Sequence, residues 1–396
     1  MSLTQTLSAD RVHIGFFGRR NAGKSSLVNA VTGQALSVVS DTPGTTTDPV
    51  RKAMELLPLG PALVIDTPGF DDEGALGALR VRKTREILRE ADIAVLVVDA
   101  AQGITGADEE LIALFKENGT PHIIALNKSD LPHSPLSALH SPFMEVSALT
   151  GENIHALKEA IARLAPQKEE RRLLAGLLSP GDYAVLVTPI DAAAPKGRLI
   201  LPQQQVLRDA LDAGACALVT KETELAAALA RLNEPPALVI TDSQVFGYVA
   251  GVVPEDVPLT SFSILFARHK GFLKAAVEGV EALRNLPEGA KVLVAEGCTH
   301  HRQCDDIGTV KLPRWIQENL HRDFAFSFCS GNEFPEDLSP YALALHCGGC
   351  MLNEKTMRAR ANIAAAQGVP LTNYGICIAW LLGILDRCLQ PFQGNL

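Results

Sequence analysis

Residues 18–25 read Gly-Arg-Arg-Asn-Ala-Gly-Lys-Ser, and this stretch decides the fold of the first part of the chain. It follows a short apolar run, Val12–Phe17, and leads into the helix-like spacing of Ser25–Thr32. A Gly-x-x-x-x-Gly-Lys-Ser turn between a strand and a helix gathers backbone N–H groups and a helix N-terminus around phosphate oxygens. Taken alone, the stretch also fits a plain glycine-containing turn between a strand and a helix.

The segments around this turn alternate between strand-like and helix-like patterns over residues 11–165. Apolar runs predict further strands at Ala62–Asp66, Ile93–Asp99 and His122–Asn127. Helix-like spacing predicts helices at Leu76–Arg89, Asp108–Asn118 and Ile154–Leu164. Such alternation is typical of a mostly parallel sheet with helices on both faces. We therefore expect residues 1–168 to form an α/β P-loop domain.

Two motifs predict how phosphates and Mg²⁺ would be bound. In a turn of this type, Lys24 contacts the β- and γ-phosphates and Ser25 binds Mg²⁺. Asp66-Thr67-Pro68-Gly69 follows a strand-like run, so Asp66 can hold Mg²⁺ through water and the Gly69 N–H can meet the γ-phosphate. The other residues expected to line the phosphates are Gly18, Asn21, Ala22, Gly23 and Ser26.

Two later motifs predict guanine as the base. Asn127-Lys128-Ser129-Asp130 ends another apolar run. The Asp130 carboxylate can accept hydrogen bonds from N1–H and the exocyclic amine of guanine, whereas adenine lacks both donors. Asn127 can brace this loop, and Ser147 and Ala148 can supply contacts near the base. Four motifs in this order predict a GTP/GDP site.

At this point the first block resembles the P-loop GTPases of the Era and MnmE group. The resemblance implies that Thr46, in the segment Ser40–Asp48, binds Mg²⁺ and that Lys24, Thr46 and Gly69 serve catalysis. Asn21 matches the asparagine that helps to bind K⁺ in potassium-dependent members. Phe70 stands where Ras-like enzymes carry a glutamine that positions water. We therefore expect slow, K⁺-stimulated GTP hydrolysis.

Two further blocks follow the first. Residues 169–182 are expected to form a linker that ends in the turn Ser179-Pro180-Gly181-Asp182. Residues 183–268 read as a smaller α/β domain, and residues 269–396 as a third block with a helix over Phe272–Leu286 and a strand over Lys291–Ala295. No fixed-period repeat is evident.

The third block carries the pattern Cys298-Thr299-His300 and, after 45 intervening residues, His346-Cys347-Gly348-Gly349-Cys350. The Cys-x-x-Cys spacing lets two thiolates bind one metal centre, and Cys/His clusters suit zinc or iron–sulfur groups. Structural zinc, a redox pair and plain core cysteines all remain open on the residues alone. Cys216, Cys377 and Cys388 are expected to be small buried apolar residues.

Joined to a GTPase, this tail resembles the HydF family of FeFe-hydrogenase maturation GTPases. The resemblance implies that Cys298, Cys347 and Cys350 hold a 4Fe–4S cluster. It implies that His300 and His346 act either as ligands or as hydrogen-bonding neighbours. It also implies a homodimer through the middle domain, a diiron precursor as cargo, radical-SAM maturases as loading partners and FeFe-hydrogenase as the recipient. The third block is thus expected to be an iron–sulfur domain, and the protein a GTPase and scaffold in H-cluster maturation.

Composition narrows the classes of function and partner that remain. The 396 residues contain 36 Lys and Arg against 45 Asp and Glu, a net charge of −9, which argues against a nucleic-acid partner. No apolar run reaches the ~18–20 residues of a membrane helix, and no signal peptide is visible, so we expect a cytoplasmic protein with no membrane partner. The alternative is a zinc-containing regulatory or ribosome-associated GTPase, against which the acidic balance counts.

Overall fold

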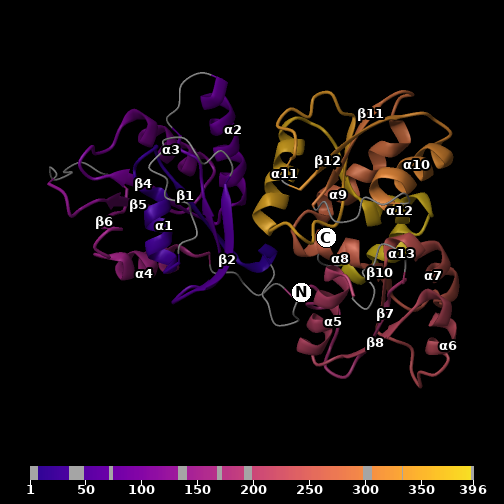
Figure 1. Cartoon of the computed structure of the whole chain (residues 1–396). Coiled ribbons are helices and arrows are strands. Elements are labelled where there is room, and N and C mark those ends of the chain that lie inside the picture. The colour runs from indigo at the N-terminus through magenta and orange to yellow at the C-terminus, as the bar shows by residue number, and fades with distance from the viewer. Residues whose placement is uncertain are drawn as a thin grey trace. The chain divides into compact units, whose positions relative to one another are not determined.

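The computed structural model describes residues 8–34, 49–70, 75–132, 141–166, 172–190, 199–297, 306–331 and 333–393. The chain divides into two compact units, Met1–Lys168 and Glu169–Leu396, and each is described by itself (Figure 1). Across these described ranges, no helix combines the length and the apolar character needed to cross a membrane.

The first unit is built on one six-stranded sheet with the order β2-β3-β1-β4-β5-β6. All neighbouring strands are parallel except β2 and β3. The mostly parallel α/β prediction is therefore confirmed, whereas the antiparallel edge strand β2 was missed because most of its side chains face solvent and form no apolar run. The strands are β1 (Val12–Phe17), β2 (Val50–Leu56), β3 (Gly60–Asp66), β4 (Ile93–Asp99), β5 (His122–Asn127) and β6 (Phe143–Glu145).

Helices cover both faces of this sheet. They are α1 (Lys24–Thr32), α2 (Ala75–Glu90), α3 (Gly106–Glu117) and α4 (Ile154–Leu164), preceded by a short 3₁₀ turn at Ser8–Asp10. Successive side chains of β1 point to opposite faces, so Phe16 packs with α1 and α4 while Phe17 packs with α2 and α3. Burial on both faces explains why β4 is apolar except for its final Asp99.

The second unit contains two four-stranded sheets, and every neighbouring pair of strands in them is parallel. The orders are β10-β9-β7-β8 and β12-β11-β13-β14. In each sheet the strand that comes first in the chain is central. The second strand in the chain lies on one side of it, and the third and fourth lie on the other side. The bounds are β7 (Tyr183–Val187), β8 (Cys216–Thr220), β9 (Leu238–Thr241), β10 (Leu259–Ser261), β11 (Lys291–Glu296), β12 (Ala325–Ser330), β13 (Leu343–His346) and β14 (Leu371–Asn373).

Nine α-helices are present in the described part of the second unit. The helix expected over Phe272–Leu286 ends as an α-helix at Val280 and continues as a 3₁₀ turn, Glu281–Asn285. The helices are α5 (Leu201–Asp212), α6 (Leu225–Leu229), α7 (Phe246–Val252), α8 (Phe262–His269), α9 (Leu273–Val280), α10 (Leu312–Leu320), α11 (Glu354–Ala366), α12 (Tyr374–Leu381) and α13 (Leu385–Leu389). Further short turns lie at Glu222–Glu224, Ser243–Val245, Ile307–Lys311 and Gln390–Phe392.

The two sheets repeat one another in local detail as well as in topology. Val257-Pro258-Leu259-Thr260 leads into β10, and Val369-Pro370-Leu371-Thr372 leads into β14. The next residue caps a helix in both places: the Ser261 and Asn373 side chains each accept a hydrogen bond at 3.2 Å from the backbone N–H three residues on. The expectation of no repeat therefore overlooked two related halves, because the identical stretch is only four residues long.

The helices that follow the fourth strand of each half, α8 and α12, pack against each other. The Asn373 amide donates a 3.2 Å hydrogen bond to the carbonyl oxygen of Ser263, at the start of α8. One apolar core includes buried residues of both sheets and both helices. Gly348, in the Cys-x-x-Cys loop of the second half, lies against α8, where an added Cβ would be 3.4 Å from the Ser263 hydroxyl. The two halves thus share their interior.

Gly375→Ala is expected to lower the free energy of unfolding. A Cβ at Gly375 would lie 2.8 Å from Ser261 Oγ and 2.9 Å from Ser263 Cβ, so α12 and α8 would have to separate. Overpacking of this kind costs ~1–3 kcal/mol. Chemical denaturation followed by circular dichroism measures the change. Gly251→Ala in α7 is the control, since a Cβ there meets nothing within 4 Å, and a loss of stability no larger than in this control would contradict the packing described.

Candidate functional site

The turn between β1 and α1 needs glycine at two positions. Gly18 has φ +141° and Gly23 has φ +86°, backbone conformations that side chains rarely adopt. An added Cβ would also lie 2.2 Å from the Val97 carbonyl oxygen at Gly18, and 2.2 Å from Asn127 Nδ2 at Gly23. The turn therefore packs directly against the ends of β4 and β5, which fixes the backbone that is expected to meet phosphate.

The groups expected to meet phosphate and Mg²⁺ lie together at this turn. Lys24, 8% exposed, donates from Nζ to the carbonyl oxygens of Gly18 at 2.9 Å and Arg19 at 2.6 Å. Ser25 Oγ donates to Asp66 Oδ2 at 2.7 Å. Asp66 is buried, and its Oδ1 has no hydrogen-bond partner in the described part of the chain. A hydroxyl beside a buried carboxylate oxygen with unused lone pairs fits a hard cation such as Mg²⁺.

The segment after β3 closes against the phosphate-binding turn. An added Cβ on Gly69 would lie 3.0 Å from the backbone nitrogen of Arg20, and the Phe70 N–H donates to the Gly18 carbonyl oxygen at 3.3 Å. The Phe70 side chain is buried in the core between α2 and α3, so it offers no group that could orient water. Thr46 and the rest of residues 40–48 lie outside the described residues.

The motifs expected to bind the base are joined by side-chain hydrogen bonds. Asn127 Nδ2 donates to the Ala22 carbonyl oxygen at 3.1 Å, and Asn127 Oδ1 accepts from the Ala148 N–H at 3.0 Å. Ser147 Oγ donates to Asp130 Oδ1 at 2.6 Å and thereby orients the exposed Asp130 carboxylate. One asparagine thus ties the phosphate-binding turn to both loops expected to recognise guanine.

Asp99 belongs to this site, although the motifs do not include it. Lys128 Nζ donates to Asp99 Oδ2 at 2.6 Å and to the carbonyl oxygen of Asn21 at 2.9 Å. Asp99 ends β4 and is the register partner of Asn127, which ends β5. An acidic residue at the end of an apolar run was the available signal, because the carboxyl ends of parallel strands meet at one edge.

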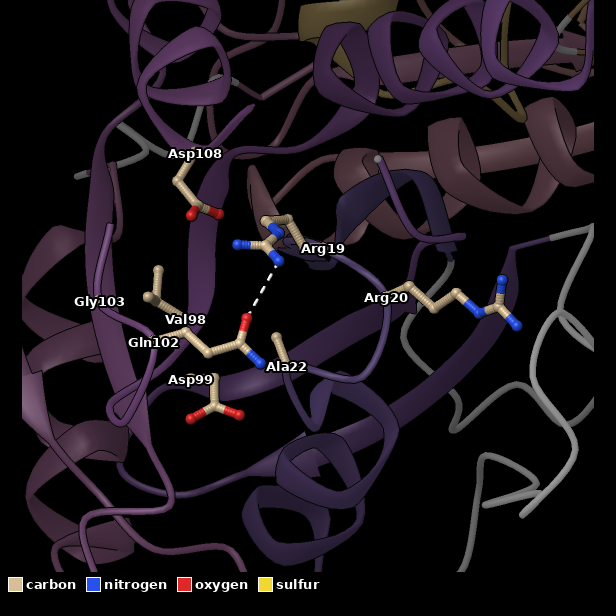
Figure 2. A pocket seen from close by; sticks show the side chains of 8 residues that line it. All are labelled: Arg19, Arg20, Ala22, Val98, Asp99, Gln102, Gly103 and Asp108. Atoms are coloured by element: carbon tan, nitrogen blue, oxygen red, sulfur yellow. Dashed lines mark hydrogen bonds between the residues drawn. The ribbon is translucent and has the colours of Figure 1, made fainter. Parts of the chain in front are cut away.

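Figure 2 shows the shallow pocket beside the phosphate-binding turn. The Arg19 side chain points into it and donates to Gln102 Oε1 at 3.0 Å, whereas the Arg20 side chain points away from it. Arg19 thus links the turn to the segment between β4 and α3. Ser26, also expected to contact phosphate, is half-buried in the first turn of α1.

The cysteine motif follows two neighbouring strands of the last sheet. Cys347 comes directly after β13, and its N–H donates to the Ala295 carbonyl oxygen of β11 at 2.9 Å. Cys347 Sγ accepts hydrogen bonds from the N–H groups of Gly297, at 3.0 Å, and Gly349, at 3.4 Å. This is where the strand order reverses, the usual binding crevice of an open parallel sheet. Cys298 lies outside the described residues, as does His300.

His346 is fully buried beneath this loop. Its Nδ1 lies 2.8 Å from the Cys347 carbonyl oxygen, and its Nε2 lies 2.8 Å from Arg360 Nη1. Burial, with the charge of Arg360, lowers the pKa of His346 to about 3, so the ring is neutral: Nδ1–H donates and Nε2 accepts. Both nitrogens are engaged, which favours the hydrogen-bonding role over the ligand role.

The remaining cysteines divide by burial. Cys377 and Cys388 are fully buried, as expected. Cys216 is exposed instead, because it begins β8 at the edge of its sheet. Cys329, near the end of β12, has its pKa raised to about 11 by burial. Cys350 is half-buried, and within the described ranges no set of three or more His, Cys, Asp or Glu side chains is placed to hold a metal ion.

Comparison with known proteins identifies both units. The model of the 50S ribosome-binding GTPases matches residues 13–128. The hydrogen maturase F dimerization domain matches residues 173–271, and the hydrogen maturase F tetramerization domain matches residues 274–391. The chain belongs to the hydrogen maturase F family. The resemblance to HydF is confirmed, and the two related halves of the second unit coincide with the two oligomerisation domains of this maturase family.

The curated relatives match only part of this chain. GTPase Der from Campylobacter lari is 31% identical over 239 residues, which cover 51% of this chain and 51% of that protein. The tRNA modification GTPase MnmE from Heliobacterium modesticaldum is 37% identical over 155 residues, which cover 37% of this chain and 33% of that protein. The matched region thus spans between a third and about half the length of these relatives.

Solved structures also match part of this chain. Era from Aquifex aeolicus bound to GDP and aluminium fluoride is 21% identical, with a TM-score of 0.35, and the match covers 53% of this chain and 93% of that one. The G domain of the FeoB iron transporter from T. maritima is 24% identical, with a TM-score of 0.30, and the match covers 39% of this chain and 98% of that one.

Proposed function

We propose that this maturase hydrolyses GTP and serves as a scaffold that binds a 4Fe–4S cluster and carries a diiron precursor to apo FeFe-hydrogenase. The observation that carries the proposal is the presence, in one chain, of a connected guanine-nucleotide site and a Cys-x-x-Cys loop at the strand-order reversal of a hydrogen maturase F domain. Radical-SAM maturases would load the precursor, and the middle domain would hold a homodimer together.

In the GTPase unit the chain itself supplies positioning and charge. Lys24 would bind the β- and γ-phosphates, Ser25 and Asp66 would hold Mg²⁺, and the Gly69 N–H would meet the γ-phosphate. Thr46 would add the switch contact to Mg²⁺. Because Phe70 is buried and carries no polar group, hydrolysis is expected to be slow. Slow turnover suits a nucleotide switch that changes which partners bind.

GTP turnover is expected to be faster in KCl than in NaCl at equal ionic strength. Asn21 is exposed in the phosphate-binding turn, with φ +61°, where its side chain can help to bind a cation beside the phosphates. A cation there would offset charge that develops between the β- and γ-phosphates, the role an arginine finger has elsewhere. Phosphate release measures the rates. Asn21→Ala should abolish the difference between the salts, and equal rates in the parent protein would exclude the cation site.

The cysteine loop fits an iron–sulfur cluster. Cys347 Sγ already accepts two backbone N–H groups, the kind of contact that tunes cluster thiolates. Cys298, Cys347 and Cys350 would be the three thiolate ligands, with His300 and His346 near them. A cluster held by three cysteines supplies one iron whose fourth ligand can be exchanged, which suits the docking of a precursor.

Metal analysis of the protein purified without oxygen tests this proposal. Roughly four iron and four sulfide per chain would support it. One zinc per chain would instead support the alternative, a zinc-containing regulatory or ribosome-associated GTPase. The iron-containing protein, loaded by the radical-SAM maturases, should then activate apo hydrogenase. Failure of that activation, with iron and GTP turnover intact, would restrict the cluster to a structural role.

A further inference from the structure

The cysteine loop rests on a buried positive charge. Arg360 lies in α11 and is 3% exposed. Its guanidinium donates from Nη1 to His346 Nε2 at 2.8 Å and from Nη2 to the carbonyl oxygen of Gly331. The Phe334 ring lies under it, 5.0 Å from the guanidinium carbon to the ring centroid. The contacts fix the guanidinium firmly, although each comes from a neutral group.

No carboxylate forms an ion pair with Arg360 among the described residues. The nearest arginine on the same helix differs: Arg358 is exposed and pairs with Glu354. A buried charge is costly to maintain unless an opposite charge offsets it, and neutral acceptors do not cancel the charge. The fold therefore keeps a cation in its interior, at a place where water is largely excluded.

The side chains near Arg360 indicate where the opposite charge would be. Burial lowers the pKa of Arg360, while the neighbouring thiols of Cys329 and Cys347 would raise it when ionised. Cys347 is also the residue whose carbonyl oxygen receives the His346 N–H. A single imidazole ring, that of His346, thus connects the Arg360 guanidinium to the cysteine loop. Three thiolates carry three negative charges, which exceed the two positive charges of the oxidised 4Fe–4S core. A bound cluster is therefore anionic, and reduction adds a further negative charge.

We propose that Arg360 is the counter-charge of the anionic iron–sulfur group at Cys347, stabilises its reduced form, and holds the cysteine loop through His346. This inference rests on the proposed cluster. Arg360 acts here as a positioning and electrostatic residue that does not itself ligate iron. A purely structural arginine would hold the loop equally well with the cluster oxidised or reduced, so the potential separates the two roles.

The test is a redox titration of the anaerobic, iron-loaded full-length protein, followed by electron paramagnetic resonance of the reduced cluster. In Arg360→Gln the ratio of oxidised to reduced cluster at a fixed potential should rise at least tenfold, which is about 59 mV for one electron. Arg360→Lys keeps the charge and should stay within about threefold of the parent. Arg358→Gln removes a charge from the same helix outside the site and should leave the ratio unchanged.

A second measurement tests the proposal if Arg360→Gln does not fold. Arg360→Met replaces the guanidinium with an apolar side chain, which a buried site without the cluster should tolerate. Iron loading should therefore raise the melting temperature more in the parent than in Arg360→Met. An equal gain in melting temperature in the parent and in Arg360→Met would overturn the counter-charge role. So would an unchanged ratio of oxidised to reduced cluster in Arg360→Gln, or an equal change of that ratio in Arg360→Gln and Arg360→Lys. Absence of iron from the parent would overturn the proposed function as well, so the two failures are distinguishable.

Discussion

Asp130→Asn should weaken GTP binding by roughly 10- to 150-fold, which corresponds to a charge-assisted hydrogen-bond loss of ~1.5–3 kcal/mol. The Asp130 carboxylate is exposed and is held from one side by the Ser147 hydroxyl, so its other oxygen is available for the base. An amide presents one acceptor and one donor in place of two acceptors, so it cannot receive both guanine N–H groups. Fluorescent-nucleotide titration measures the change.

Binding of a different base shows whether the Asp130→Asn protein is folded. Xanthine has a carbonyl where guanine has the exocyclic amine, and an asparagine amide can donate to that carbonyl. Asp130→Asn should therefore bind xanthosine triphosphate more tightly than the parent does. Glu110→Gln, an equal charge change at an exposed position of α3, should leave both affinities unchanged. If Asp130→Asn bound GTP as tightly as the parent, the assignment of the base site would be wrong.

Cys347→Ser should remove essentially all bound iron from the anaerobically purified protein. A serine hydroxyl is a poor replacement for a thiolate in an iron–sulfur site, and Cys347 is the cysteine whose sulfur receives the N–H groups of Gly297 and Gly349. Iron and sulfide assays, with the visible absorption spectrum, report the loss. Nucleotide affinity should not change, since the substitution lies outside the GTPase unit.

The chain offers a matched control in Cys216→Ser. Cys216 is an exposed thiol in β8, in the other half of the same unit. That variant should retain the iron content and the spectrum of the parent. Retention of the cluster by Cys347→Ser, or an equal loss in both variants, would refute the assignment of the ligand.

The nucleotide site could be predicted because each of its motifs is a short contiguous stretch at the end of an apolar run. Asp66 and Asn127 end strands whose parallel pairing brings their ends to one edge, so the order of the motifs already implied their proximity. Cys347 likewise follows β13, which pairs with the strand that precedes Cys298, but no strand was expected ahead of Cys347. Sequence pattern was sufficient wherever neighbours in space follow from strand order.

Contacts between segments distant in sequence were not predictable. Arg360 lies 14 residues beyond His346 on a helix of mixed polarity, and no periodicity indicates that its guanidinium is buried. Likewise β2 is an exposed edge strand with no apolar run. The relation between the two halves of the second unit depends on topology, which four matching residues are too few to reveal.

The packing of α8 on α12 makes the second unit resemble a dimer joined in one chain. Each half supplies the helix after its fourth strand to an interior that belongs to both, so a cut between the family domains, near residue 272, would expose apolar surface on each fragment. The halves should therefore unfold together in one transition. Since α8 also lies against the backbone of Gly348, a shift of the half that matches the dimerization domain would move a neighbour of the cysteine loop.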